Sequence, residues 1–190
     1  LAIPAYDELF DEIDLEGLVE KKGILYIWNN KNLKSRELEI KIRNELGIKQ
    51  QLVTPKEIHD LEPHIKPIYH GGVYYPYARH ARNPKKILLK LFKLFLEKGG
   101  KFLKMDVKEV KFDLDKPILI TDTQSFIFDK LVVACGAFSK KLTDQLGENI
   151  PLDTERGYHV HFKGMDHLLS RAVINLDRGF GLTPMNQGMR

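Results

Sequence analysis

The sequence predicts a mixed α/β (α+β) fold, and three stretches carry the prediction. Leu131–Cys135 is a short apolar run followed by Gly136, the pattern of a strand covered on both faces in a parallel sheet. Pro84–Lys98 has apolar residues at helical spacing and ends at Gly99-Gly100, as amphipathic helices do. Between these two, short extended runs predict an antiparallel meander. That order is typical of an α/β nucleotide-binding domain with a β insertion.

The N-terminal half alternates predicted helices with short strands. Thr54 followed by Pro55 and Glu57 forms a capping box with proline at the first helical position, so a helix is expected there and must end by Pro63. Longer helices are expected over residues 5–22 and 33–46. Extended segments are expected over residues 24–28, 51–53 and 71–76.

The C-terminal half is predicted to be richer in strands. The meander is expected over residues 102–112, 117–121 and 125–128, and a short helix over 139–146 should stop at Gly147. Longer strands over 151–163, 172–175 and 180–183 are expected to be antiparallel, in a second domain that begins near residue 148. We therefore expect the chain to divide into three parts, residues 1–78, 79–147 and 148–190.

Composition indicates a globular protein of ordinary character. Of the 190 residues 43% are hydrophobic and 29% charged, and no apolar run approaches the length of a membrane span. The single Cys135 excludes a disulfide framework and fits a reducing, cytoplasmic location. We expect its thiol to be a small buried hydrophobe. The chain opens on LAIPAYDELF, without a basic region or an initiator Met, which suggests a piece of a longer protein.

The net charge of +4 is spread along the chain, so a solvated basic surface is expected and nucleic acid is not an expected partner. The helix Pro84–Lys98 carries Lys86, Lys90 and Lys93 opposite its apolar stripe. Such a helix can lie on a membrane. Packing on a sheet as a crossover helix, with the lysines reaching outward, is the favoured interpretation.

Two kinds of side chain could carry chemistry. His159 and His161 would share one face of a strand and could ligate a metal, but no third ligand lies nearby in sequence, and two half-exposed strand residues are the simpler interpretation. Arginines in turn-like surroundings are suited to capturing a carboxylate; they are Arg79, Arg82, Arg156, Arg178 and Arg190. No serine-protease-like elbow, P-loop or paired-cysteine motif is present.

Several motifs together resemble the FAD-dependent D-amino-acid oxidase/dehydrogenase superfamily. They are LVTPKEIHDLEP from Leu52, GGVYYP from Gly71, the helix and strand from Asn83 to Val110, DKLVVACGAFSKKLTDQLG from Asp129, PLDTERGYHVHF from Pro151 and GFGLTPMNQGMR from Gly179. The resemblance implies part of a FAD-binding Rossmann-like domain at 79–147. It also implies a substrate domain built on a largely antiparallel sheet with helices on one face, from 1–78 and a truncated 148–190. The GxGxxG turn with which the family begins is missing, so this chain alone is expected to hold FAD weakly and to be inactive.

The resemblance also assigns residues. Val107, Cys135, Gly136 and Ala137 fall where the family's backbone passes the adenine and ADP part of FAD. Tyr158, with Arg156 just before it, falls on the strand that lines the substrate side. Tyr77 and His80 fall near the mouth of the pocket. No catalytic residue is assigned.

The implied chemistry is hydride transfer from the α-carbon of a D-amino acid or small amine to FAD, with oxygen or a quinone as electron acceptor. Peripheral membrane association of the full-length enzyme stays open. Two alternatives remain: a FAD-dependent 2-hydroxy-acid dehydrogenase, and a non-catalytic basic module that binds nucleic acid or anionic lipid. A substrate panel on the full-length protein distinguishes the 2-hydroxy-acid dehydrogenase from the amino-acid enzyme. A salt-dependent gel shift would favour the non-catalytic binding module.

Overall fold

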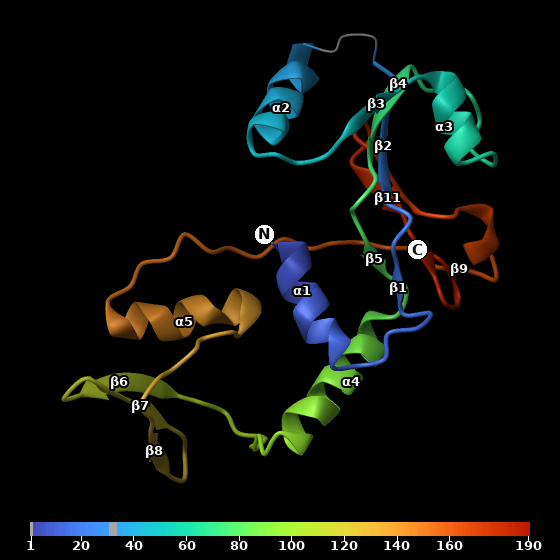
Figure 1. The fold of residues 1–190 in the computed structure, drawn as a ribbon. Helices are drawn as coiled ribbons and strands as arrows, with labels where there is room; N and C mark the ends of the chain where they lie inside the picture. Colours follow the sequence, from blue (N-terminus) through green and yellow to red (C-terminus); the bar gives the residue numbers. More distant parts are fainter. Residues whose placement is uncertain (1, 31–33) are drawn as a thin grey trace. The chain divides into compact units, whose positions relative to one another are not determined.

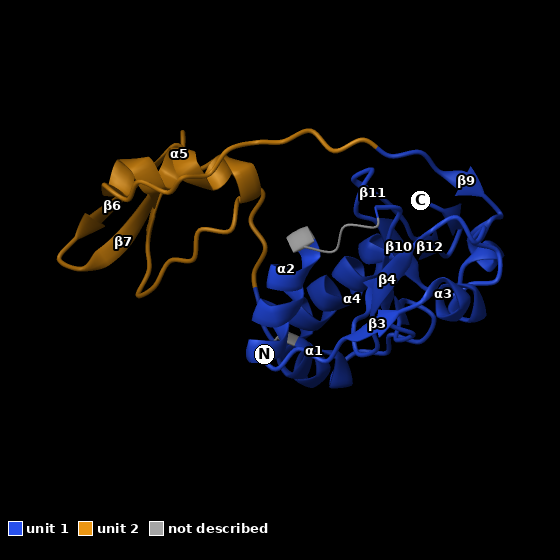
Figure 2. Ribbon diagram, turned by 90° about the horizontal axis from the view of Figure 1, so that it is seen from above, with its two compact units in different colours: residues 1–100, 159–190 blue, residues 101–158 orange. Residues whose placement is uncertain are grey.

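The computed structural model describes residues 2–30 and 34–190 (Figure 1). The chain divides into two compact units, one of residues 1–100 with 159–190 and one of residues 101–158 (Figure 2). These boundaries differ from those expected near residues 78 and 147. The assignment of one part to a cofactor and the others to a substrate stays a prediction, because a division into compact units does not test it.

The larger unit is built on a five-stranded sheet in the order β11-β10-β2-β4-β3. β10 runs parallel to β2, and every other neighbouring pair is antiparallel, so the sheet is largely antiparallel as expected. Its strands are β2 (Ile24–Trp28), β3 (Gln51–Val53), β4 (Gly71–Tyr75), β10 (Ala172–Asn175) and β11 (Phe180–Leu182).

Alternation along the strands gives this sheet two different faces. On one face Leu25, Ile27, Val53 and Val173 are buried and pack against Ile58 of the helix α3 (Pro55–Leu61); we call this the covered face. The register places Ile24, Tyr26 and Tyr75 together on the opposite face, which we call the tyrosine face. The hydrophobic core of the unit therefore lies between the covered face and α3.

The helices of this unit follow the predicted starts better than the predicted lengths. They are α1 (Ala2–Asp11), α2 (Lys34–Glu45), α3 (Pro55–Leu61) and α4 (Pro84–Glu97). The capping box of α3 is confirmed: the Glu57 N–H donates to Thr54 Oγ1, and the Glu57 carboxylate accepts from the Thr54 N–H at 2.7 Å. The helix expected over 5–22 ends at Asp11. Residue 33, the expected start of α2, lies outside the described residues.

α4 forms as predicted, but its expected packing on a sheet is wrong. Leu88 on the apolar stripe is 66% exposed, and no described residue of α4 is buried. The strand before it, β5 (His80–Ala81), pairs only with the two-residue β1 (Val19–Glu20), and this pair is too small to form a layer beneath a helix of 14 residues. Instead α4 and α1 form walls of one cavity, and Lys90 forms an ion pair at 3.0 Å with Asp14, three residues after the end of α1.

The long strand expected over 151–163 is reduced to β9 (Phe162–Lys163), which pairs with β13 (Gly188–Met189) beside β12 (Pro184–Met185). Residues 151–161 form no strand because no described strand runs beside them. His159 and His161 are therefore not displayed on one face of a strand. Among the residues the structure describes, no group of His, Cys, Asp and Glu could hold a metal ion.

The smaller unit contains the predicted meander, formed by β6 (Glu109–Asp113), β7 (Lys116–Ile120) and β8 (Ser125–Ile127). The helical segment predicted over 139–146 is also present. It consists of the 3₁₀ turn η1 (Gly136–Phe138), α5 (Ser139–Thr143) and the turn η2 (Asp144–Leu146), which ends at the left-handed Gly147. The Gln145 amide joins this segment to β6 by accepting from the Val110 N–H at 2.8 Å and donating to the Lys108 carbonyl at 3.1 Å.

The buried strand expected over Leu131–Cys135 is not formed. The segment is irregular, Val132 is 85% exposed, and the Cys135 thiol is exposed rather than buried. A strand in a parallel sheet needs a neighbour on each edge to satisfy its N–H and C=O groups. None of the described strands pairs with these residues, so an apolar run by itself does not become a strand.

Candidate functional site

A cavity of about 470 Å³ lies in the smaller unit between the segment before β6 and the segment around α5. Val107 and Cys135, which the resemblance assigned to the cofactor, both line it, together with Phe138 and Lys141. The Cys135 N–H donates to Ser139 Oγ at 3.0 Å, which ties the turn to the start of α5. The two stretches that the resemblance brought together thus form one cavity wall.

Gly136 and Ala137 continue this wall at the surface. Gly136 has φ +56, in the left-handed region that favours glycine, and no atom lies within 4 Å of the place its Cβ would take. Ala137 is exposed. The backbone at this turn is therefore open to close approach by a flat or phosphate-bearing ligand.

A second cavity, of about 480 Å³, lies on the tyrosine face of the larger unit. Tyr77, assigned near a pocket mouth, lines it with Tyr26, Tyr75 and Arg43. The rings of Tyr26 and Tyr75 meet edge to face with centroids 5.3 Å apart, an arrangement that aromatic pairs favour. We call this the tyrosine cavity.

Arg43 lies over this aromatic wall. Its Cζ is 5.7 Å from the centroid of the Tyr75 ring, a cation–π distance. Nη1 of Arg43 donates to Glu39 Oε2 at 3.1 Å, one turn earlier on α2. Burial raises the pKa of the Tyr75 hydroxyl, and the Arg43 charge offsets part of that effect, so the hydroxyl stays a neutral donor and acceptor.

His80 does not line the tyrosine cavity. It lines a separate, mainly apolar cavity of about 470 Å³ between α1 and α4, with Val19 and Leu91 among the other walls. Its Nε2 donates to the Pro184 carbonyl at 3.1 Å, since a carbonyl can only accept, and its buried Nδ1 has no hydrogen-bond partner among the described residues. Burial lowers the pKa of this imidazole, which favours the neutral form.

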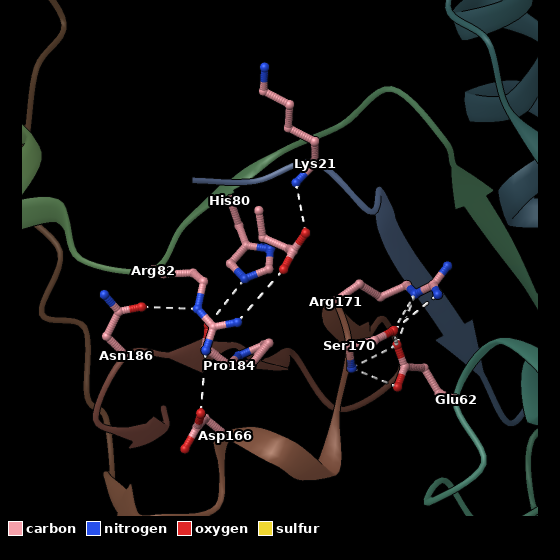
Figure 3. Close-up of polar contacts among 10 residues, drawn as sticks. Lys21, Glu62, His80, Arg82, Asp166, Ser170, Arg171, Pro184 and Asn186 are labelled. Atoms are coloured by element: carbon pink, nitrogen blue, oxygen red, sulfur yellow. Dashed lines mark hydrogen bonds and ion pairs between the residues drawn. The ribbon is translucent and has the colours of Figure 1, made fainter. Parts of the chain in front are cut away.

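Two of the arginines suspected of binding a ligand hold the fold together instead. Arg79 makes a two-pronged ion pair with Asp7 of α1. Arg82 donates to Asp166 at 3.3 Å and to Asn186 at 3.0 Å, joining β5 to the hairpin of β12 and β13 (Figure 3). Neither guanidinium is free to receive a ligand without breaking these contacts.

The sequence alone did not reveal a buried charge cluster at the other side of Figure 3. The Glu62 carboxylate accepts from the Ser170 N–H, from Ser170 Oγ at 2.6 Å and from Arg171 Nε at 2.8 Å. The Glu62 side chain is 2% exposed and that of Arg171 is 11% exposed. Glu62 was visible only as part of the Leu-Glu-Pro stop of α3, and nothing local points to partners that lie more than a hundred residues away.

Arg156 and Tyr158 belong to the smaller unit and line none of these cavities. Both are exposed, Tyr158 at 86%, in a segment that forms no strand. Of the assigned residues, the structure therefore brings together Val107 with Cys135, and it places Tyr77 in a cavity with residues that were not assigned. No described helix is long and apolar enough to cross a membrane.

Known proteins share this sequence pattern. A family model described as FAD dependent oxidoreductase (DAO) matches residues 1–190. The chain is 27% identical over 184 residues to a D-amino-acid oxidase of Bradyrhizobium diazoefficiens, covering 96% of this chain and 44% of that protein. It is 27% identical over 169 residues to D-amino acid dehydrogenase 3 of Mesorhizobium japonicum, covering 84% of the chain and 40% of that protein.

Solved structures share the fold. Glycine oxidase from Geobacillus kaustophilus matches with a TM-score of 0.73 at 17% identity, over 98% of this chain and 51% of that one. L-Proline dehydrogenase from P. horikoshii matches with a TM-score of 0.77 at 15% identity, over the same shares. The chain thus spans about half the length of these proteins. Because the family model matches throughout, the chain belongs to the DAO family of FAD-dependent oxidoreductases.

Proposed function

We propose that this chain is part of an enzyme that oxidatively deaminates D-amino acids or related small amines by hydride transfer to FAD. The family match over residues 1–190 carries the proposal. D-Amino-acid oxidase and dehydrogenases among the relatives support this substrate class. The electron acceptor, oxygen or a quinone, is the second reactant in this proposal.

The smaller unit has features that suit the adenine end of FAD. Its cavity of about 470 Å³ has an apolar wall at Val107 and Phe138 and a cation at Lys141, and the open turn at Gly136 leaves room for phosphate oxygens near backbone N–H groups. In the proposal Val107, Cys135, Gly136 and Ala137 hold this end of the cofactor. When bound, the flavin supplies the hydride acceptor.

The work left to the protein is binding and orientation of a small amine. Tyr77, on the wall of the tyrosine cavity, is the assigned substrate residue with the best-defined surroundings. Arg156 and Tyr158 stay assigned to the substrate on the strength of the Arg-Gly-Tyr-His motif. His80 donates to the Pro184 carbonyl, and burial lowers its pKa. It lines a separate cavity, so in this proposal it would position the segment that leads to Tyr77 without touching the substrate.

The absorbance spectrum of the full-length protein tests the proposal. Bound flavin should bleach when single D-amino acids are added without oxygen, and L-enantiomers should bleach it more slowly. Bleaching by 2-hydroxy acids but by no amine would replace this function with the 2-hydroxy-acid alternative. A protein that binds no flavin after reconstitution would contradict both.

A further inference from the structure

We infer that the tyrosine cavity binds a small carboxylate with an apolar or aromatic side chain, with Arg43 holding the carboxylate. This rests on the proposed function in one respect: the ligand would be the amino-acid substrate. The binding itself is a property of the cavity, and it can be tested without any turnover.

The walls of the cavity suit an apolar or aromatic group. The antiparallel register of β2 and β4 sets Ile24 opposite Tyr75, and Tyr26 follows on the same face. Tyr77 adds a third ring, and Ile48 adds an aliphatic side from the loop after α2. Edge-to-face rings around a space of about 480 Å³ fit a flat or branched side chain of amino-acid size.

Among the described residues, Arg43 is the arginine that lines the tyrosine cavity. Four other arginines are committed to carboxylates from distant parts of the chain; they are Arg36 with Asp177, Arg79 with Asp7, Arg82 with Asp166 and Arg171 with Glu62. The carboxylate beside Arg43 comes from Glu39, four residues earlier and 43% exposed. Such surface pairs within one helix are weak, so a two-pronged ligand carboxylate can replace this partner.

The charge of the cavity favours an anion over an amine. Lys49 lines it beside Arg43, and none of the described residues that line it is acidic. The Glu39 carboxylate pairs with Arg43 but does not itself line the cavity. The carbonyl oxygens of Arg43 and Asn44 at the end of α2 accept from the N–H groups of Ile48 and Gly47, both at 2.9 Å. These hydrogen bonds satisfy two of the carbonyls at the C-terminal end of α2, an end of a helix that favours cations such as Arg43 and Lys49.

The test is binding of phenylacetate, with neutral phenylacetamide as its isostere, to the full-length protein by calorimetry. We expect phenylacetate to bind at least tenfold more tightly. Arg43→Gln should weaken phenylacetate binding tenfold or more and leave phenylacetamide binding unchanged. Arg43→Lys, which keeps the charge, should weaken phenylacetate binding less than Arg43→Gln does. Lys41→Gln is the matched control: it removes a cation from the same helix, from a side chain that is 73% exposed and does not line the cavity. It should change neither affinity.

Thermal melting of each variant confirms that it is folded. Should Arg43→Gln fail to fold, Tyr77→Ala replaces it, because Tyr77 is a mainly exposed wall residue; it should weaken both probes alike. Equal affinity for the two probes, no detectable binding of phenylacetate, or equal effects of Arg43→Gln and Lys41→Gln would each overturn the inference.

Flavin bleaching separates this inference from the proposed function. Phenylacetate binding that depends on Arg43, in a protein whose flavin no amino acid bleaches, supports the site and contradicts the function. Turnover of amino acids with a kcat/KM that Arg43→Gln leaves unchanged supports the function and overturns the site as the place of the substrate carboxylate.

Discussion

Replacing Glu62 with Gln should destabilise the larger unit strongly. Both carboxylate oxygens are in use: Oε1 accepts from Ser170 Oγ and Arg171 Nε, and Oε2 from the Ser170 N–H. An amide puts an NH₂ donor against one of these donors and leaves the Arg171 charge without its partner. The Glu62 side chain is 2% exposed, and breaking a buried pair in this way costs about 3–5 kcal/mol, a large part of a typical folding free energy of roughly 5–15 kcal/mol.

Urea unfolding followed by the fluorescence of Trp28 measures this loss. Trp28 is the protein's one tryptophan and is 4% exposed in β2, so its signal reports on the larger unit. With a slope of about 1–3 kcal/mol per molar urea, the midpoint should fall by at least ~1 M at unchanged slope. Glu45→Gln is the matched control: this carboxylate is 64% exposed, and the change should stay within about 0.5 kcal/mol.

A double-mutant cycle tests the physical reason. Arg171→Met should also destabilise, because it leaves the buried Glu62 charge without its ion-pair partner. The double variant should then lose less than the sum of the two single losses. Our reasoning would be refuted if Glu62→Gln lowered stability no more than Glu45→Gln, or if the two losses at Glu62 and Arg171 simply added.

Three further substitutions test local features. Thr54→Ala should cost about 1 kcal/mol in the same urea assay by removing the cap of α3, and Thr54→Ser should restore most of it; equal stability of all three proteins would argue against the cap. Burial lowers the His80 pKa in the folded protein. As the pH falls below about 6.5, the unfolded chain therefore binds a proton at His80 before the folded protein does, and the free energy of unfolding should decrease. His80→Gln should flatten this dependence, and an unchanged pH profile would show that the imidazole does not cause it. Gly136→Val forces a branched residue to φ +56 and should weaken FAD binding to the full-length protein about tenfold, read by flavin fluorescence. Gly99→Val, strained at φ +87 but remote in sequence from the cavity wall, should leave FAD affinity unchanged, and equal losses would deny Gly136 a place at the cofactor.

Much of the secondary structure could be predicted because its causes are local. The cap at Thr54 and the stop of α4 at Gly99-Gly100 depend on neighbours within a few residues. The strands β2, β3 and β4 and the meander of the smaller unit follow the same rule, since each is a short β-rich run between turn residues. Family membership could also be predicted, because the motifs occur in the family's order and spacing.

The two clearest failures concern segments whose state depends on partners. Leu131–Cys135 has the composition of a buried strand, but a strand exists only where another lies within hydrogen-bonding distance, and none of those described does. The α4 stripe likewise has helical spacing, but its burial requires a layer beneath it, and β5 supplies only two residues. A sequence pattern specifies which face is apolar. It does not specify what covers that face.

The amino-acid sequence by itself thus determined the local elements, the family and the stretches that could meet a cofactor. Only the tertiary structure decided which charges meet. It joined Glu62 to Ser170 and Arg171, committed Arg79 and Arg82 to the fold, and left Arg43 over Tyr75 beside an open cavity. A hydrogen bond needs its partner within about 3 Å, and salt screens exposed charges from one another beyond roughly 10 Å. The role of an ionised side chain therefore depends on its neighbours in space, and outside a single helix these neighbours cannot be read from distance along the chain.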